Sequence, residues 1–325
     1  MNSSIIRVIH SLPCGAALIE TVLCDYPIED VRKCVLYKRG LNDTYLVESS
    51  QAKYILRVYR RGWRTKAAID FELELLEFLR QHNLAVAYPI AKKTGGFTTA
   101  IAAPEGTRYA AIFSYAAGKA VNQKLDCEQS QRLGETVAKI HKATDNFVSS
   151  FSRPELDYEY LLDWAMDAIA PLFEYRPNDI DRLDEQVAQI KAQLRHLALP
   201  KTTFTYGICI GDVHSGNAHF DQYNQPTLFD FDQCGYGWRA FDIAKFMHTT
   251  YAWKLDNRIR ESFWQGYQNV RQLSQAEVES ISLFTKVAHI WVTGISCAVV
   301  EDVLAYGWFT DEWFDAKLAL LSELS

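Results

Sequence analysis

Two apolar segments that each run into acidic residues constrain the fold of this chain more than any other feature. The first, at residues 205–212, ends at Asp212, and the second, at residues 226–232, carries Asp230. Asn217 follows Asp212 in a D-x-x-x-x-N spacing. A loop that leaves a buried strand and folds back brings two polar side chains at this spacing to one point. The sequence therefore predicts two short strands whose ends build one polar site.

The residue types at this site favour phosphoryl-transfer chemistry. Protein kinases use the D-x-x-x-x-N spacing in their catalytic loop, where the Asp receives the proton of the acceptor hydroxyl and the Asn holds Mg²⁺. Carboxylate, carboxamide and phosphate oxygens are the ligands that Mg²⁺ prefers. We therefore predict Asp212 as the catalytic base and Asn217 and Asp230 as Mg²⁺ ligands. Asp232 is either a helper at the metal or a solvated loop residue.

The first third of the chain is predicted to form a small lobe rich in β-strands. Its predicted elements are strands at residues 31–40, 44–50, 53–60, 95–103 and 108–118 and a helix at residues 67–83. A tight hairpin turn at residues 40–43 joins the first two strands. The segment before Pro27 is predicted to be helical. The apolar face of this first helix would hold Ala16, Ala17, Ile19, Val22 and Leu23.

The rest of the chain is predicted to be mainly helical. Helices are expected at residues 126–144, 158–173 and 180–199 and again from about residue 240 to the end, with the two short strands between them. A strand-rich lobe followed by a larger helical lobe makes this an α+β chain with a protein-kinase-like bilobal fold. We expect a nucleotide-binding lobe at residues 1–117 and a catalytic and acceptor-binding lobe at residues 118–325.

A cation on the third strand is predicted to hold the phosphates of ATP. Kinases place a lysine at this point and pair it with a glutamate of the following helix. Here the candidates are Arg57 and Glu72, and Arg can replace Lys because it binds phosphate through two parallel hydrogen bonds. If Arg57 does not serve this role, Lys53 is the next candidate.

Two further segments of the first lobe are predicted to contact the nucleotide. The hairpin turn would place Asn42, Asp43 and Thr44 at the phosphates. The segment at residues 113–118, where the lobes join, offers its backbone to an adenine ring, with Phe113 and Tyr115 as its candidate residues.

These motifs resemble those of the aminoglycoside phosphotransferase superfamily, which includes choline kinases, homoserine kinases and a stress-response Ser/Thr kinase. The resemblance rests on GDVHSGN together with LFDFDQCGYGWRAFDIAKF, and it extends to RLGETVAKIHKAT and FWQGYQNVRQLSQAEVE. It implies that Asp212 is the base, that Asn217 and Asp230 hold Mg²⁺, and that Asp242 and His214 brace the catalytic loop. Two positions depart from the family pattern. Ile210 stands where many members have His, and Arg57 stands where Lys is common.

The charge of the chain is unevenly distributed. Residues 1–120 carry 16 Lys and Arg against 11 Asp and Glu, whereas residues 121–325 carry 18 against 29. This pattern argues against a nucleic-acid surface along the chain and favours a cationic partner for the second part, unless it serves solubility alone. The acidic residues expected to attract such a partner are Glu301, Asp302, Asp311, Glu312 and Asp315.

The composition favours a cytoplasmic protein without a membrane segment. The longest apolar stretch, near residues 290–300, is interrupted by Thr293, Gly294 and Ser296. The N-terminus is expected to begin a helix rather than to act as a signal peptide. The seven cysteines form no C-x-x-C pair, which suits reduced thiols used as small hydrophobic groups.

Taken together, these features predict an ATP- and Mg²⁺-dependent phosphotransferase. Its acceptor is expected to be a small cationic molecule with a hydroxyl group, such as an amino alcohol, an amino acid or an aminoglycoside. Two alternatives stay open: a Ser/Thr protein kinase of the stress-response type and a nucleotide-binding pseudokinase. The short segment between LFDFD and FDIAKF leaves little room for the activation segment of a protein kinase.

Overall fold

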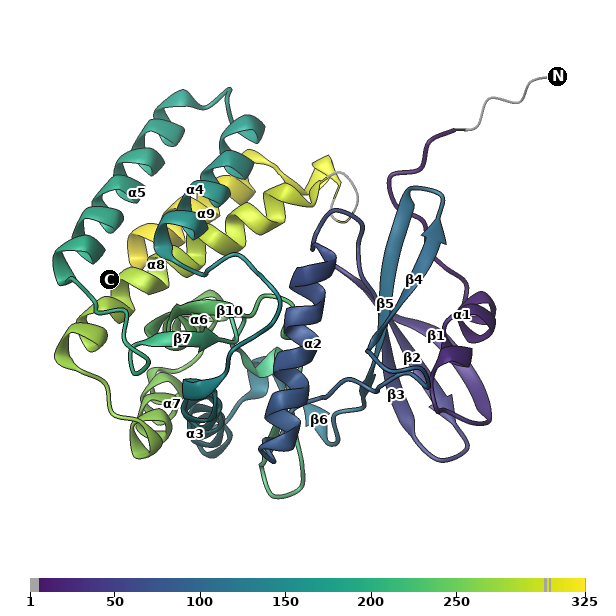
Figure 1. Ribbon diagram of the computed structural model, residues 1–325. Coiled ribbons are helices and arrows are strands. Elements are labelled where there is room, and N and C mark those ends of the chain that lie inside the picture. Colours follow the sequence, from purple (N-terminus) through teal and green to yellow (C-terminus); the bar gives the residue numbers. More distant parts are fainter. Residues whose placement is uncertain (1–5, 301–302, 304, 325) are drawn as a thin grey trace. The chain divides into compact units, whose positions relative to one another are not determined.

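The computed structural model describes residues 6–300, 303 and 305–324. By their internal contacts they divide into two compact units. Unit 1 comprises Met1–Phe78, Ala87–Tyr115 and Ser149–Ser152, and unit 2 comprises Leu79–Val86, Ala116–Val148 and Arg153–Ser325. Figure 1 shows strands gathered in unit 1 and helices in unit 2. The predicted α+β class is confirmed.

Unit 1 is built on an antiparallel five-stranded sheet in the order β1-β2-β3-β5-β4. Its strands are β1 (Val31–Arg39), β2 (Asp43–Ser49), β3 (Lys53–Val58), β4 (Thr98–Ala103) and β5 (Gly106–Ser114). The register places Thr44 of β2 and Ala111 of β5 on either side of Arg57. Buried side chains on one side of the sheet, including Tyr45 and Val47, form the core together with α1 (Gly15–Thr21). Helix α2 (Lys66–Gln81) follows β3 along the chain.

The predicted N-terminal helix is too long. Among the described residues before Pro27, only α1 is α-helical, and a 3-10 turn follows at Leu23–Asp25. The buried residues are Leu18, Val22 and Leu23, whereas Ala16 and Ala17 are exposed. The segment before α1 is not helical, because side chains of the sheet form hydrogen bonds with its backbone carbonyl groups. Tyr45 Oη donates to the carbonyl oxygen of Pro13 at 2.5 Å, and Arg108 Nη1 donates to that of Ser11 at 2.8 Å.

Unit 2 consists mainly of helices, with short strands that carry the predicted motif. The helices are α3 (Cys127–Ala143), α4 (Tyr158–Ile169), α5 (Pro177–Leu197), α6 (Ala240–Ala252), α7 (Asn257–Val270), α8 (Gln275–Ala298) and α9 (Asp311–Glu323). Strand β7 (Tyr206–Cys209) pairs antiparallel with β10 (Gly235–Trp238). A second small sheet has the order β6 (Lys119–Ala120), β8 (Ala218–Phe220) and β9 (Pro226–Leu228).

Close helix packing holds the core of unit 2 together. Helices α3 and α7 lie side by side (Figure 1) because Gly134 of α3 leaves room for the backbone of Phe263, where a Cβ would come within 2.1 Å of a carbonyl oxygen. Helix α8 packs against α4 and α6. Within the described part of the chain, α8 alone is long and apolar enough to cross a membrane, but most of it is buried inside the structure, as in the core helix of a globular unit.

Candidate catalytic site

The loop after β7 carries Asp212 and depends on a glycine. Gly211 has a φ of 84°, a conformation that residues with a Cβ rarely adopt, and a Cβ there would lie 2.1 Å from the carbonyl oxygen of Gln233. The backbone of the loop therefore lies directly against the segment that follows Asp230. This close approach determines the position of the backbone immediately before Asp212.

Asp212 is held by three side chains of unit 2. Lys245 Nζ of α6 lies 2.8 Å from Asp212 Oδ1, and His214 Nε2 lies 3.5 Å from Oδ2. Asn217 Nδ2 donates to Asp212 Oδ2 and to its backbone oxygen, both at 3.1 Å. Burial alone would raise the pKa of Asp212, but Lys245 and His214 outweigh it and hold that pKa below its ordinary value. The lowered pKa keeps the carboxylate ionised, and its 20% exposure leaves it reachable from solvent.

Asp242 braces the loop from the first turn of α6, as the family resemblance implies. It accepts hydrogen bonds from the backbone N–H groups of Ile210, at 2.6 Å, and Gly211, at 2.8 Å. His141 Nε2 of α3 donates to Asp242 Oδ2 at 2.8 Å, and His141 Nδ1 lies 2.8 Å from the Tyr267 hydroxyl oxygen. Burial lowers the pKa of His141 although Asp242 opposes the shift, which favours the neutral imidazole. In that form Nδ1 accepts the hydrogen bond from the Tyr267 hydroxyl.

Ile210 does not leave Asp242 without a histidine partner. The Ile210 side chain is buried, and its backbone N–H donates to Asp242. The imidazole partner is His141, which comes from α3. His214 stays in the loop, where its Nδ1 accepts from the backbone N–H of Gly216 at 3.0 Å, so the expected bracing contact of His214 is also present.

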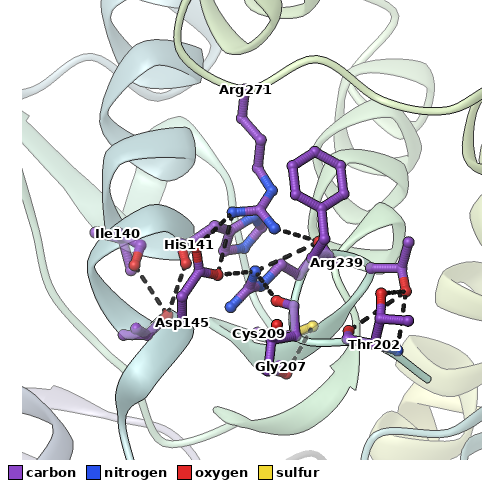
Figure 2. A network of polar contacts seen from close by, with 12 residues as sticks. Ile140, His141, Asp145, Thr202, Gly207, Cys209, Arg239 and Arg271 are labelled. Carbon is purple, nitrogen blue, oxygen red and sulfur yellow. Dashed lines mark hydrogen bonds and ion pairs between the residues drawn. The ribbon is translucent and has the colours of Figure 1, made fainter.

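A second polar network lies next to His141 and ties three segments of unit 2 together (Figure 2). Arg239 Nη1 lies 2.5 Å and Arg271 Nη1 lies 3.2 Å from the same oxygen, Asp145 Oδ1. Both arginines are buried, and both also donate to the backbone carbonyl oxygen of Phe204. Two buried guanidinium groups therefore share one carboxylate.

The two predicted metal ligands lie on connected segments. The backbone N–H of Phe229 donates to the carbonyl oxygen of Asn217 at 3.0 Å, which joins the end of β9 to the catalytic loop. Asp230, the next residue, is half-buried and has a φ of 65°. A left-handed backbone at a non-glycine residue is uncommon and concentrates at functional sites. Asp232 is 3% exposed, so its interpretation as a solvated loop residue is wrong.

These residues have the chemistry of a Mg²⁺ site completed by a ligand. The described residues hold no group of three or more His, Cys, Asp or Glu side chains suited to a metal ion. Mg²⁺ commonly takes one or two protein carboxylates together with substrate phosphates and waters. The carboxylate of Asp230 and the carboxamide oxygen of Asn217 fit that donor set, since the contacts of Asn217 to Asp212 use its Nδ2.

In unit 1 the expected pair on β3 and α2 is present. Arg57 Nη1 lies 2.7 Å from Glu72 Oε1, and the Tyr59 hydroxyl donates to Glu72 Oε2 at 3.0 Å. The guanidinium of Arg57 lies 4.9 Å from the centroid of the Phe113 ring. Arg57, Glu72 and Phe113 are buried, and Tyr115 is half-buried.

The hairpin turn is supported by its own side chains. Asn42 Oδ1 accepts from the backbone N–H of Arg60 at 3.1 Å, and Asp43 Oδ2 lies 2.7 Å from Arg108 Nη2. Both Asn42 and Asp43 are buried, whereas Thr44 is half-buried beside Arg57. Contact of Asn42 and Thr44 with a phosphate stays a prediction.

The acidic residues expected to attract a cation have other partners where they are described. Asp311 and Asp315 of α9 pair with Arg176, at 3.3 and 2.5 Å from its Nη1 and Nη2. Glu312 is exposed, and Glu301 and Asp302 lie outside the described residues.

Comparisons with known proteins agree with this geometry. Residues 38–277 match the model of the APH family, described as the phosphotransferase enzyme family. The chain is 39% identical over 316 residues to an uncharacterized protein of Synechocystis sp., covering 97% of this chain and 87% of that protein.

Solved structures show the same fold. An amicoumacin kinase, hAmiN, in complex with AMP-PNP, Ca²⁺ and Ami has a TM-score of 0.79 at 20% identity, over 95% of this chain and 92% of that one. A microcompartment-associated aminopropanol kinase has a TM-score of 0.71 at 19% identity, over 94% of each chain. The protein-kinase-like fold predicted from the sequence is thereby confirmed.

Proposed function

This chain belongs to the phosphotransferase enzyme family, and we propose that it transfers the γ-phosphoryl group of ATP, with Mg²⁺, to a hydroxyl group of a small cationic acceptor. The observation that carries the proposal is the arrangement around Asp212. An ionised, partly exposed carboxylate lies on a braced loop and is hydrogen-bonded to Asn217. A backbone hydrogen bond from Phe229 to Asn217 joins this loop to the segment that carries Asp230.

Each residue has a defined part in this reaction. Asp212 accepts a hydrogen bond from the acceptor hydroxyl, orients its oxygen toward phosphorus and takes its proton as the new bond forms. Mg²⁺, when held by Asn217 and Asp230, supplies positive charge that offsets the charge of the phosphates. Arg57 carries five N–H donors, so a bond to Glu72 is compatible with a further bond to phosphate. Asn42, Thr44, Phe113 and Tyr115 complete the proposed nucleotide contacts of unit 1.

The cationic acceptor is supported by charge and by one relative. Residues 121–325 carry the acidic excess of the chain, which would raise the local concentration of an ammonium compound. One structural neighbour is, by its name, a kinase for aminopropanol, an amino alcohol. The free state of all seven cysteines fits the cytoplasmic location that we include in the proposal.

A screen of acceptors tests the proposed function. ADP release is followed with ATP, Mg²⁺ and a panel of amino alcohols, amino acids, aminoglycosides, their uncharged hydroxyl analogues and a protein Ser/Thr substrate. We expect amine-bearing hydroxyl compounds to give the highest kcat/KM, with a value that falls as salt rises from low to physiological strength. A best acceptor that is neutral or anionic would exclude the cationic class, and turnover of the protein substrate alone would favour the protein-kinase alternative.

Replacement of Asp230 by Asn is expected to weaken nucleotide binding only when Mg²⁺ is present. Asn tolerates the left-handed backbone at this position, so the change removes the charge while the loop conformation is kept. With Mg²⁺ present, we expect the affinity for ATP to fall by about tenfold or more, which is the usual effect of losing one charged contact. Without Mg²⁺ the affinity should stay within about twofold of the wild-type value. Titration calorimetry with and without EDTA measures both values. The control is D221N, at a carboxylate that caps the turn between β8 and β9, and equal losses with and without Mg²⁺ in D230N would indicate a structural role instead.

Replacement of Arg57 by Ala is expected to raise the KM for ATP by about tenfold or more, because a charge-assisted contact to phosphate is lost. R57K should recover part of the loss, since Lys restores the charge but not the planar fork. Steady-state kinetics with the best acceptor provides the comparison. The control is K53A, on the same strand, where Lys53 is exposed and lies 3.4 Å from Glu48. A raised KM in K53A together with an unchanged KM in R57A would assign the phosphate contact to Lys53.

A further inference from the structure

Helix α6 presents a buried lysine to the carboxylate that takes the acceptor proton in the proposed reaction. Lys245 Nζ lies 2.8 Å from Asp212 Oδ1, and it donates to Thr249 Oγ1 at 3.1 Å. The Lys245 side chain is 4% exposed. Lys245 lies in the segment FDIAKF, but its contact with Asp212 is visible only in the folded chain.

The position of Lys245 is fixed by the same helix that braces the loop. Asp242 lies three residues earlier on α6 and binds the backbone N–H groups of Ile210 and Gly211. Residues three apart lie on one face of a helix. One face of α6 therefore contacts both the backbone before Asp212 and the carboxylate of Asp212.

The ammonium group has a donor to spare. Lysine carries three N–H donors, and among the described residues two of them are used, on Asp212 and Thr249. Two further contacts occupy the other carboxylate oxygen of Asp212, from Asn217 and His214. A buried cation with one remaining donor thus lies beside the carboxylate that would accept the proton.

This arrangement suits a phosphoryl group better than it suits general-base catalysis alone. An ammonium group at 2.8 Å stabilises the charged carboxylate of Asp212 and so makes that carboxylate a weaker base. Phosphoryl transfer, however, passes through a loose transition state with negative charge on three equatorial oxygens, and cations that face this charge speed the reaction. The attacking oxygen must lie about 2.6–3.2 Å from Asp212 and about 3–3.5 Å from phosphorus, and these separations allow a phosphoryl oxygen to approach the same Nζ.

We infer that Lys245 is a catalytic residue whose third N–H binds an oxygen of the transferred phosphoryl group; the inference rests on the proposed function. As the bond between the acceptor oxygen and phosphorus forms, the bond from phosphorus to the bridging oxygen of ADP breaks. The acceptor proton passes to Asp212 Oδ2, and ADP leaves with the electron pair of the broken bond. Lys245 exchanges no proton and supplies charge throughout.

The affinity for nucleotides with and without a γ-phosphate tests this inference. The dissociation constants of Mg·AMP-PNP and Mg·ADP are measured for the wild type, K245M, K245R and K139M, the last a control at an exposed lysine of α3. We expect K245M to raise the dissociation constant of Mg·AMP-PNP by about tenfold or more, because one charge-assisted hydrogen bond is lost. The dissociation constant of Mg·ADP should rise by less than about twofold. K245R should recover part of the affinity for Mg·AMP-PNP, and K139M should match the wild type.

A second pair of variants removes the effect that K245M has on Asp212. K245M leaves the Asp212 carboxylate without its nearest cation, and this alone could disturb the site. The affinities for Mg·AMP-PNP and Mg·ADP are therefore also compared between D212N and D212N/K245M, which both lack that carboxylate. Selective loss of Mg·AMP-PNP affinity in the double variant supports the contact with the phosphoryl group. If the ratio of the two affinities is the same with and without Lys245 in both backgrounds, Lys245 only positions Asp212 and the inference is overturned. If the wild type binds neither nucleotide, the proposed function fails, and the inference fails with it.

Discussion

Replacement of Asp212 by Asn is expected to lower the rate of phosphoryl transfer by about 10²-fold or more, while the affinity for Mg·ATP stays within a few-fold of wild type. Asn keeps the size of the side chain and one oxygen, but it cannot take a proton from the acceptor. The nucleotide affinity is spared because Asp212 acts on the acceptor, and the proposed nucleotide and metal contacts use other residues. Single-turnover kinetics and calorimetry measure the two quantities separately.

The matched control for this variant is D157N. Asp157 is also an unburied carboxylate of unit 2, and it accepts a hydrogen bond from the backbone N–H of Tyr160 at the start of α4. It has no proposed part in the reaction, so its rate should equal that of the wild type. Transfer by D212N at a rate near that of D157N would remove Asp212 from its role as the base.

Replacement of Asp242 by Ala is expected to destabilise the protein by about 3–5 kcal/mol, the usual cost of removing one partner from a buried charged network. The change leaves His141 and the backbone N–H groups of Ile210 and Gly211 without their acceptor. Each buried donor without a partner carries a desolvation cost of about 1–3 kcal/mol. Urea denaturation of the wild type and the variant measures the loss.

The variant D157A, which removes a helix N-cap, is the control for the stability loss expected in D242A. D157A also removes an aspartate that accepts a backbone N–H, but at the half-buried N-terminus of α4, where the expected cost is only about 0.5–2 kcal/mol. D242A should therefore unfold at a clearly lower urea concentration than D157A. A loss in D242A no larger than that in D157A would mean that the brace on the catalytic loop is not part of the stable core.

Local motifs predicted the segments that carry the candidate site. The D-x-x-x-x-N spacing places Asp212 and Asn217 within hydrogen-bond distance because the loop turns back within a few residues. The pair Arg57 and Glu72 also follows from local rules, since strand alternation and helix periodicity determine the faces on which they lie. Such predictions succeed where neighbouring residues decide the geometry.

Partners that are distant in the sequence could not be predicted in the same way. His141 meets Asp242 through the packing of α3 near α6, and Lys245 meets Asp212 through the position of α6 on the loop. The one sequence signal for Lys245 is its spacing of three residues after Asp242 on a predicted helix. Ion pairs between helices depend on how the helices pack, and the hydrophobic pattern of one sequence does not specify those contacts.

The number of acidic residues in a segment likewise does not show which of them form ion pairs within the protein. Asp311 and Asp315 were expected to attract a cationic acceptor, yet both lie against Arg176. The N-terminal helix was predicted too long for a related reason, because tertiary hydrogen bonds to residues before α1 outweigh the local preference for helix. In both cases the deciding interaction comes from a segment far away in the sequence.

The most direct test of the central claim is the chemical fate of the γ-phosphoryl group. Wild-type protein is incubated with ATP, Mg²⁺ and the best acceptor of the panel, and the products are followed by ³¹P NMR. We expect one phosphomonoester on an acceptor hydroxyl for each ADP formed, and loss of that signal in D212N. Release of the group only as inorganic phosphate, its appearance on an amine or carboxylate, or the absence of any ADP with every acceptor would exclude transfer to a hydroxyl group.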